Sequence, residues 1–396
     1  MIALKDIRVF DMTRVLAGPF CTQILGDLGA DVIKIEQPGI GDGTRAWGPP
    51  FEKDTARQDT TESAYYLSCN RNKRSLTLDI TKPEGFEIAR QLIEKSDIFV
   101  ENFKTGFLAQ YGLGYEDVKK IKPDIIYCSI TGFGQAGPYA HRPGYDFQVQ
   151  GLSGLMSLIG EPDGPPFRAG ISIADIATGI YSALAILAAL YQRTQTGQGQ
   201  FIDMALLDST MSLLSFAAQS YLLDGNLPPR VGNGHPNIVP YGVFQAQDGF
   251  VVVAIGTEAQ FEKFCHFVGR EDLLAHPHYL RNEMRVHHRE EVMAEMNKII
   301  GAKPRGYWIE NLEKAGVPTG PVNTLEEAFQ NPQVKASGIV QSFKDGLKTV
   351  ASPLHLSGAP PVCERRPPRL GEHTKEILSA FLSTAQIDEL KQKEVI

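Results

Sequence analysis

The chain has 396 residues and a net charge of −7, with 42% hydrophobic and 21% charged residues. This length exceeds one ordinary hydrophobic core, and the composition is that of a globular protein, so two domains are expected. No run of five or more basic residues occurs, which argues against nucleic acid as the main partner, whereas an anionic small molecule stays possible.

In chain order, the first part alternates short β-branched strands with amphipathic helices. Strands are predicted at residues 7–11, 31–35, 76–80, 97–100 and 124–131, and helices at residues 18–29 and 83–95. Because residues 4–11 already read as a first strand, no targeting peptide is expected before the fold. Strands that alternate with helices predict a parallel sheet covered on both faces, an α/β fold.

The second part of the chain has a different pattern of predicted elements. A long apolar helix is predicted at 176–191, followed by a strand at 201–205, a helix at 207–222 and a loop rich in Gly, Pro and Asn at 224–240. A hairpin at 242–255 turns at Asp248-Gly249, and helices follow at 258–268, 288–300, 307–315 and 325–329. β-like sequence resumes at 339, before helices at 372–382 and 386–393. We therefore predict a large discontinuous domain, 1–223 and 331–396, and a small α+β domain, 224–330.

Cysteine and histidine usage indicates a protein without disulfides or metal. The cysteines stand far apart, without a C-x-x-C pair, at Cys21, Cys69, Cys128, Cys265 and Cys363, which favours reduced thiols in a cytoplasmic protein. Histidines without a metal-ligand spacing are interpreted as surface or packing residues: His276, His278, His287 and His288. The longest apolar run, 183–191, is about half a bilayer span, so no membrane anchor is expected.

Asp175 begins the long apolar helix, in the segment I-S-I-A-D-I-A-T-G over residues 171–179. A carboxylate at a helix start faces free N–H groups and a partial positive charge, which favours its ionised form. It is then suited to act as a nucleophile that needs no metal. The alternative is a capping box, S-x-x-D, in which Ser172 and Asp175 serve only their own backbone. The segment alone leaves both interpretations open.

Loops that follow the strands carry candidate ligand contacts. Residues 132–137 match G-x-G-x-x-G, but Pro138 follows at once, which disfavours a dinucleotide site; the glycines either admit a ligand to the backbone or form a plain loop. Residues 70–75, N-R-N-K-R-S, form either a solvated turn or an anion site. Residues 13–19 and 101–104 follow strands at the edge where open α/β sheets bind ligands, and together predict a cleft.

Taken together, these segments resemble the family III CoA-transferases. The resemblance runs through D-M-T-R-V-L-A-G-P-F from Asp11, L-G-A-D-V-I-K-I-E from Leu28, N-R-N-K-R-S from Asn70, V-E-N-F from Val100, G-I-S-I-A-D from Gly170, G-V-P-T-G-P-V from Gly316 and L-G-E-H-T from Leu370. It implies a Rossmann-like large domain with a parallel sheet, a smaller domain and an interlocked homodimer. It also implies acyl-CoA and carboxylic acid substrates, no metal, and Asp175 as the nucleophile.

Within that family, the chain is most similar to the succinate–hydroxymethylglutarate (glutaryl) CoA-transferases, through W-G-P-P-F, S-C-N-R-N-K and I-I-Y-C-S-I-T-G. This implies dicarboxylate substrates, with Arg71 as the candidate for the distal carboxylate and Arg45, Arg168, His235 and Tyr145 as further substrate contacts. The implied CoA contacts are Val15, Leu16, Leu78, Asp79, Thr81, Asn102, Phe103, Lys104, Gly132, Phe133 and Gly134. Glutamines, Gln37 and Gln110, stand where the family has arginines, so Lys104 or Arg74 is expected to supply the charge.

Two relatives of different chemistry share this pattern. Alpha-methylacyl-CoA racemases carry a histidine in a G-H-D segment, where this chain has Gly144-Tyr145-Asp146; a phenol with a pKa of about 10 is a poor proton shuttle at neutral pH. The glycine-rich flap of formyl-CoA transferase is replaced by residues 232–241, which disfavours formate and oxalate. A racemase-type isomerase and a non-catalytic acyl-CoA-binding protein remain the alternatives to a CoA-transferase.

Overall fold

The computed structural model describes residues 2–396, which divide into two compact units. Unit 1 contains the chain up to Ser153, Gly170–Leu214 and Lys335–Ile396, and unit 2 contains Gly154–Ala169 and Ser215–Val334. Both units are therefore discontinuous in sequence. The sequence prediction divides the chain at 223 and 330 and does not set residues 154–169 apart.

Unit 1 is built on a six-stranded parallel sheet with the order β5-β2-β1-β6-β7-β8, and this confirms the predicted α/β fold. The strands are β1 (Arg8–Met12), β2 (Asp31–Glu36), β5 (Lys73–Thr77), β6 (Ile98–Glu101), β7 (Ile126–Thr131) and β8 (Gln200–Ala205). From β1 the chain proceeds outward through β2 to β5, and from β6 it proceeds the other way through β7 to β8. The order thus reverses between β1 and β6, and open α/β sheets bind ligands at the carboxyl ends of the strands that flank such a reversal.

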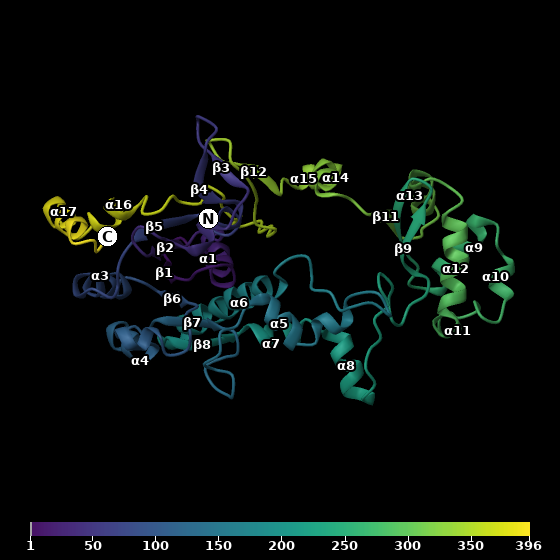
Figure 1. Ribbon diagram of the computed structural model, residues 1–396, viewed down its shortest axis with the longest axis horizontal. Coiled ribbons are helices and arrows are strands. Elements are labelled where there is room, and N and C mark those ends of the chain that lie inside the picture. The colour runs from purple at the N-terminus through teal and green to yellow at the C-terminus, as the bar shows by residue number, and fades with distance from the viewer. Residues whose placement is uncertain (1) are drawn as a thin grey trace. The chain divides into compact units, whose positions relative to one another are not determined.

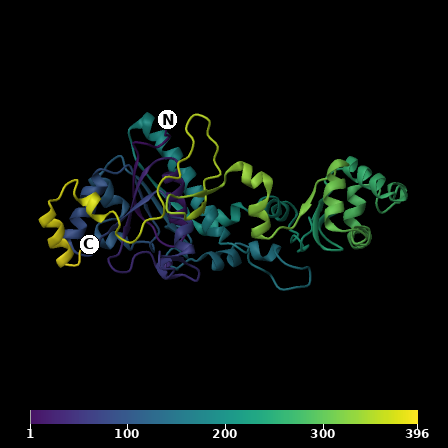
Figure 2. The same cartoon turned by 90° about the horizontal axis from the view of Figure 1, so that it is seen from above.

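Successive residues of a strand point to opposite faces of the sheet. Apolar side chains therefore lie on both faces of this sheet, and helices cover both. Phe10 belongs to the core beneath the C-terminal helices, and its neighbour Val9 belongs to the opposite core. Figures 1 and 2 both show the C-terminal helices beside α3. The helices of unit 1 are α1 (Ala17–Asp27), α2 (Ala64–Ser68), α3 (Pro83–Glu94), α4 (Tyr115–Ile121), α5 (Asp146–Leu152), α6 (Ile173–Thr196), α7 (Leu206–Ser212), α16 (Thr374–Leu378) and α17 (Thr384–Gln392).

Among residues 2–396, two two-stranded antiparallel hairpins and three 3-10 turns lie outside the larger sheets and the α-helices. The hairpins pair β3 (Phe51–Lys53) with β4 (Asp59–Ser63) and β12 (Val340–Ser342) with β13 (Lys348–Val350). The 3-10 turns are η1 (Gly43–Ala46), η2 (Leu108–Tyr111) and η3 (Leu155–Leu158). The sequence does not predict the β3–β4 hairpin, because residues 51–63 are mostly polar and do not alternate.

Unit 2 packs helices against a three-stranded antiparallel sheet with the order β11-β10-β9. Its strands are β9 (Tyr241–Ala246), β10 (Gly249–Ala254) and β11 (Thr319–Pro321), and its helices are α8 (Ser215–Asp224), α9 (Glu258–Val268), α10 (Asp272–Ala275), α11 (Asn282–His287), α12 (Arg289–Ile300), α13 (Arg305–Lys314) and α14 (Leu325–Gln330), with α15 (Pro332–Ser337) at the return to unit 1. The β9–β10 hairpin turns where Asp248-Gly249 predicts it. The single helix predicted at 207–222 is instead two helices, α7 and α8, because Ser215 has a φ of 47°.

Helix α6 is long and apolar enough to cross a membrane by length and composition alone, with a mean hydropathy of 1.9 over its most apolar window, half of which is buried. In unit 1 it packs along α1, α5 and α7 (Figure 1). Small residues allow this approach: a Cβ at Gly179 would lie 2.7 Å from the carbonyl oxygen of Ala17. The other side of α6 exposes Ile180, Leu184 and Tyr191.

Candidate active site

Asp175 lies in the first turn of α6, and a second aspartate, Asp146, caps that turn. The Asp146 Oδ1 atom accepts hydrogen bonds from the N–H of Ala174 at 2.8 Å and from the N–H of Asp175 at 3.4 Å. Ser172, the residue before the helix, makes no side-chain cap bond. The capping-box interpretation of S-x-x-D is therefore wrong, because the first-turn donors are taken by a residue of α5.

The Asp175 carboxylate itself is available to a ligand. It lines a cavity of about 310 Å³, and over residues 2–396 no hydrogen bond to its oxygens is found. These oxygens are not buried atoms that lack a partner. They are accessible, so water or a substrate can reach them. The side chain is thus held at the helix start without being used to stabilise it.

Burial, with the nearby charge of Asp146 adding to it, raises the pKa of Asp175 to about 7. The helix start therefore does not lower the pKa of this carboxyl group, contrary to what the sequence led us to expect. Desolvation disfavours the charged form, and the helix N–H groups that would favour it already bind Asp146. At pH 7 roughly half of the Asp175 side chains carry a proton.

The Asp175 cavity lies at the carboxyl ends of β1, β6 and β7, where the sheet order reverses. The predicted cleft between residues 13–19 and 101–104 is found there. Asn102 joins its two walls, because its side chain accepts the N–H of Arg14 at 2.8 Å and donates to the Arg14 carbonyl at 2.6 Å. The lining includes Val15, Leu16, Asn102, Phe103, Lys104, Gly132 and Tyr145, seven of the residues singled out from the sequence.

A second cavity of about 430 Å³ adjoins the first. Leu78, Asp79 and Thr81 line it together with Gln37, and both cavities share Arg14, Gly43 and Phe103 in their walls. The expected CoA contacts thus divide into two connected groups. Phe133 and Gly134 belong to neither lining, and no helix opens in residues 132–137, as a dinucleotide site would require.

Three cations without a carboxylate partner line the Asp175 cavity: Arg14, Lys104 and Arg142. Nowhere in the described chain, residues 2–396, do they form an ion pair. The Arg14 guanidinium lies 4.0 Å from the centre of the Phe103 ring, and that of Arg142 lies 3.9 Å from the Tyr139 ring. Stacking on a ring leaves the N–H edge of a guanidinium free for an anion.

The hydroxyl of Thr105 adds a further unused donor. It lines the same cavity, and among residues 2–396 its Oγ1 is the one buried side-chain polar atom without a hydrogen-bond partner. Buried polar groups are nearly always satisfied, so an orphan in a cavity points to a bound group. Sequence reasoning singled out neither Thr105 nor Arg142, although Arg14 falls within the predicted loop 13–19.

The loop after β1 is held in a strained conformation. Val15 has a φ of 70°, which costs a β-branched residue roughly 1–3 kcal/mol. Both Asp42 carboxylate oxygens accept its N–H at 3.2 Å, and Asp42 pairs at 3.0 Å with the fully buried Lys34. Burial acts to raise the pKa of Asp42, but the Lys34 charge and bonds from Thr44 outweigh it and lower that pKa to about 2. A buried ion pair therefore fixes the backbone that lines the cavity.

The structure does not bring Arg71 or Arg45 to the Asp175 cavity. Arg71 binds Asp27 through Nε at 2.9 Å and Nη2 at 2.5 Å, and donates to the Val350 carbonyl at 2.9 Å. Arg45 binds Glu36 through Nε at 2.9 Å and Nη2 at 2.7 Å. Both guanidiniums are buried and occupied by carboxylates of this chain, so we do not assign substrate recognition to them.

The basic segment 70–75 is neither the solvated turn nor the anion site expected from the sequence. Lys73 is fully buried and donates to the Pro19 carbonyl and the Asn70 side chain, both at 2.9 Å. Arg74, the expected substitute for a missing arginine, pairs with Asp31 at 2.6 Å and Glu376 at 3.0 Å. Internal partners thus use the charge of this segment, and Lys104 remains the candidate for that role.

Arg168 and His235 belong to unit 2. Arg168 is exposed, and the His235 ring lies between those of Phe216 and Tyr241, at 5.4 and 5.6 Å. Tyr145 lines the Asp175 cavity in unit 1 and is 65% exposed. Of the five predicted substrate contacts, Tyr145 is therefore the one that shares a cavity with Asp175 among the described residues.

Comparison with known proteins identifies relatives over nearly the whole chain. Residues 4–374 match the family described as CoA-transferase family III. The chain is 46% identical over 384 residues to a succinate–glutarate CoA-transferase of Agrobacterium fabrum, covering 95% of each protein. It is 43% identical over 383 residues to the human succinyl-CoA:glutarate CoA-transferase, covering 96% of this chain and 86% of the human one.

Solved structures agree with the fold. A CAIB/BAIF family protein from Brucella suis superimposes with a TM-score of 0.86 at 44% sequence identity, covering 94% of this chain and 98% of that one. Rv3272 from Mycobacterium tuberculosis gives a TM-score of 0.84 at 27% identity, covering 96% and 99%.

Proposed function

The chain belongs to CoA-transferase family III, and we propose that it moves CoA between an acyl-CoA thioester and a free dicarboxylate of the succinate and glutarate type. Relatives at 46% and 43% identity that carry succinate and glutarate in their names support this substrate class. One observation carries the mechanism: Asp175 lines the cavity at the sheet reversal with no hydrogen bond to its carboxylate.

In the proposed reaction, the ionised Asp175 attacks the thioester carbonyl of the donor. The C–S bond breaks, and the products are a mixed anhydride and the CoA thiolate. The thiolate then attacks the aspartyl carbonyl, releases the donor acid and leaves an aspartyl-CoA thioester. The acceptor carboxylate attacks this thioester to form a second anhydride, and the thiolate attacks its acyl carbonyl. This step yields the new acyl-CoA and restores Asp175.

The adjoining cavities suit the two ends of an acyl-CoA. We assign the acyl end to the Asp175 cavity and the nucleotide end to the cavity lined by Leu78, Asp79 and Thr81. Arg14, which lines both, and Lys104 are the cations available to the phosphates. Arg142 lines the Asp175 cavity alone, and we assign to it the distal carboxylate of the dicarboxylate.

The deciding experiment compares Asp175→Asn with Asp208→Asn in a transfer assay with succinyl-CoA and glutarate. Asp208 is an exposed aspartate in the first turn of α7, outside both cavities, so it is a matched control. We expect Asp175→Asn to lose transfer completely and Asp208→Asn to keep it. Mass spectrometry of enzyme quenched during turnover should detect an adduct on the peptide that contains Asp175.

Appreciable turnover by Asp175→Asn would contradict the mechanism. Exchange of the deuterium at the 2-position of an acyl-CoA, without CoA transfer, would indicate an isomerase instead. Binding of acyl-CoA with neither activity would indicate a non-catalytic binding protein.

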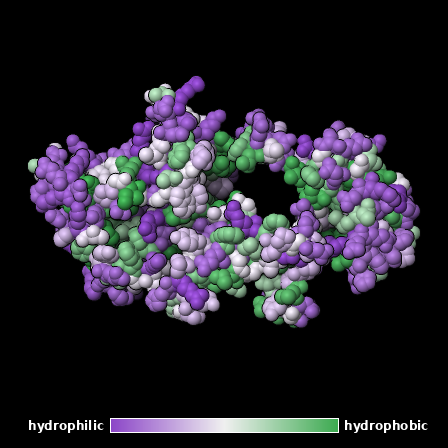
Figure 3. Space-filling view, in the orientation of Figure 1, coloured by the Kyte–Doolittle hydropathy of each residue, from purple (hydrophilic) through white to green (hydrophobic). Residues whose placement is uncertain are grey.

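The proposal includes a homodimer. Large apolar side chains stand exposed on α6, where Leu184 is 60% and Tyr191 69% exposed, and on α8, where Leu222 is 76% and Leu223 82% exposed. Figure 3 shows apolar surface at α8. Exposed apolar faces of this kind mark protein–protein contacts. Light scattering during size-exclusion chromatography should give twice the chain mass of 43.5 kDa, and a monomeric mass at micromolar concentration would contradict the proposal.

A cytoplasmic location is also proposed. Its support is that the five cysteines are free, four of them buried, as is usual where thiols stay reduced. Cell fractionation with a cytoplasmic marker enzyme tests it, and recovery in the membrane or secreted fraction would contradict it.

A further inference from the structure

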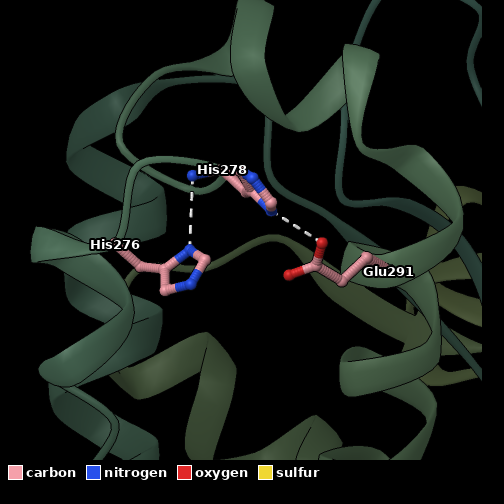
Figure 4. A group of neighbouring side chains, drawn as sticks. All are labelled: His276, His278 and Glu291. Carbon is pink, nitrogen blue, oxygen red and sulfur yellow. Dashed lines mark hydrogen bonds and ion pairs between the residues drawn. The ribbon is translucent and has the colours of Figure 1, made fainter.

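Unit 2 brings two histidines and a glutamate together on its surface, and none of the three lines the cavities described above. His276 directly follows α10, His278 lies two residues further in the same turn, and Glu291 is in the first turn of α12. Figure 4 shows the two imidazoles with the Glu291 carboxylate facing them. The ligand-type atoms of the three side chains all lie within 4.8 Å of one another.

The contacts within this group are those that a cation would replace. His278 Nδ1 and Glu291 Oε2 are hydrogen-bonded at 2.7 Å, and the His276 Nδ1 accepts the backbone N–H of His278 at 3.3 Å. A tetrahedral ion with bonds of about 2.0–2.1 Å needs donor atoms roughly 3.4 Å apart. Small rotations of exposed side chains bring the donors to that spacing, and the long 3.3 Å bond is the one most easily exchanged.

The surroundings hold these side chains in place while leaving the group open. The Tyr279 side chain, 5% exposed, belongs to the core of unit 2 and anchors the turn that carries both histidines. The His288 ring stacks on that of His278 with the ring centres 3.5 Å apart. The side chains of His278 and Glu291 are 38% and 47% exposed, so an ion can enter from solvent.

We propose that His276, His278 and Glu291 bind one divalent transition-metal ion of the zinc class. Two imidazole nitrogens and one carboxylate oxygen form a ligand set typical of Zn²⁺, with water at the fourth position, and the same set binds Co²⁺, Ni²⁺ and Cu²⁺. The sequence does not predict this site, because His276-x-His278 and Glu291 match no familiar spacing and become neighbours only through the fold. The site is independent of the proposed transferase reaction.

Tag-free full-length protein, stripped with a chelator, is titrated with Co²⁺ and then with Zn²⁺. Co²⁺ in a tetrahedral site absorbs in the visible range, so we expect these bands to rise to one equivalent and to disappear when Zn²⁺ displaces Co²⁺. Isothermal titration with Zn²⁺ should give one site per chain. His278→Gln should weaken Zn²⁺ binding at least tenfold, and Glu291→Gln should weaken it similarly.

The matched control is His266→Gln, an exposed histidine of α9 in the same unit that also contacts carboxylates but lies outside the group. It should bind Zn²⁺ as the unchanged protein does, and circular dichroism should show all three variants folded. Absence of Co²⁺ bands, or equal Zn²⁺ affinity in folded His278→Gln and the unchanged protein, would overturn the proposal. Neither readout uses transferase activity, so failure here is distinct from failure of the proposed reaction.

Discussion

Replacing Asp175 by asparagine should stabilise the fold while it removes activity. The carboxylate is partly buried, lacks hydrogen-bond partners in the described chain and lies near Asp146, and its pKa is raised from the ordinary 3.8 to about 7. That rise corresponds to about 4 kcal/mol of disfavoured ionisation. Because the cavity admits solvent, we expect Asp175→Asn to gain about 2 kcal/mol at pH 8, which raises the thermal midpoint by roughly 4 °C.

The stability gained by Asp175→Asn should increase as the pH rises. A carboxyl group whose pKa is higher in the folded than in the unfolded state favours folding when protonated, and this contribution is lost as pH rises from about 4 to about 7. Asparagine carries no charge at any pH. The advantage of the variant should therefore be largest at pH 8, shrink by pH 5 and vanish near pH 4.

Thermal unfolding of the two proteins between pH 5 and pH 8.5 measures this difference, with Asp208→Asn as the control that should change little at any pH. A variant that is no more stable than the unchanged protein at pH 8, or whose advantage is the same at pH 5 and pH 8, would refute the reasoning. Either result would mean that the ionised Asp175 carboxylate has favourable partners in the folded protein and does not destabilise it.

Three further predictions follow from the same structure. The kcat/KM for transfer should rise about tenfold per pH unit below pH 6 and level off above pH 8, because the ionised fraction of Asp175 increases through a pKa of about 7; a flat profile from pH 5.5 to 8 would contradict this. Arg142→Gln should raise the KM for the acceptor glutarate tenfold or more, whereas Arg57→Gln, on the exposed β3–β4 turn, should leave it within about twofold. Arg71→Gln should lower the free energy of unfolding, measured by urea titration, by about 3 kcal/mol, because it leaves the buried Asp27 without its ion-pair partner. A raised KM for the dicarboxylate at unchanged stability would instead support the substrate role expected from the sequence.

The sequence predicted most strands of the sheet because they carry their own signals, although β5 (Lys73–Thr77) begins three residues before the strand predicted at 76–80. The strand predicted at 31–35 is β2 (Asp31–Glu36), and that at 97–100 is β6 (Ile98–Glu101). Both are buried runs of β-branched or aromatic residues bounded by turns, which is the pattern of a parallel sheet. The position of the cleft followed from this, because ligand loops gather where the strand order reverses.

Residue roles within the site were harder to predict, because they depend on partners far apart in the chain. Arg71 was expected to bind a substrate carboxylate, but the carboxylate that it binds is that of Asp27, 44 residues earlier. An arginine fork pairs with an internal carboxylate by the same chemistry as with a substrate. The sequence shows the chemistry of such a side chain and does not show whether the fold has already used it.

The Asp146–Asp175 pair shows why the nucleophile needed the structure to be understood. A local pattern, S-x-x-D, offered a stabilising role for Asp175, and that role is filled by a carboxylate 29 residues earlier. Having Asp146 as the cap leaves the Asp175 carboxylate without a hydrogen bond, so that burial and the nearby charge of Asp146 raise its pKa and weaken the fold. A carboxylate kept for structure alone would instead lose protons easily and accept several hydrogen bonds, as Asp42 does. The contrast between these two aspartates of one unit separates a group that supports the fold from one that is free to react.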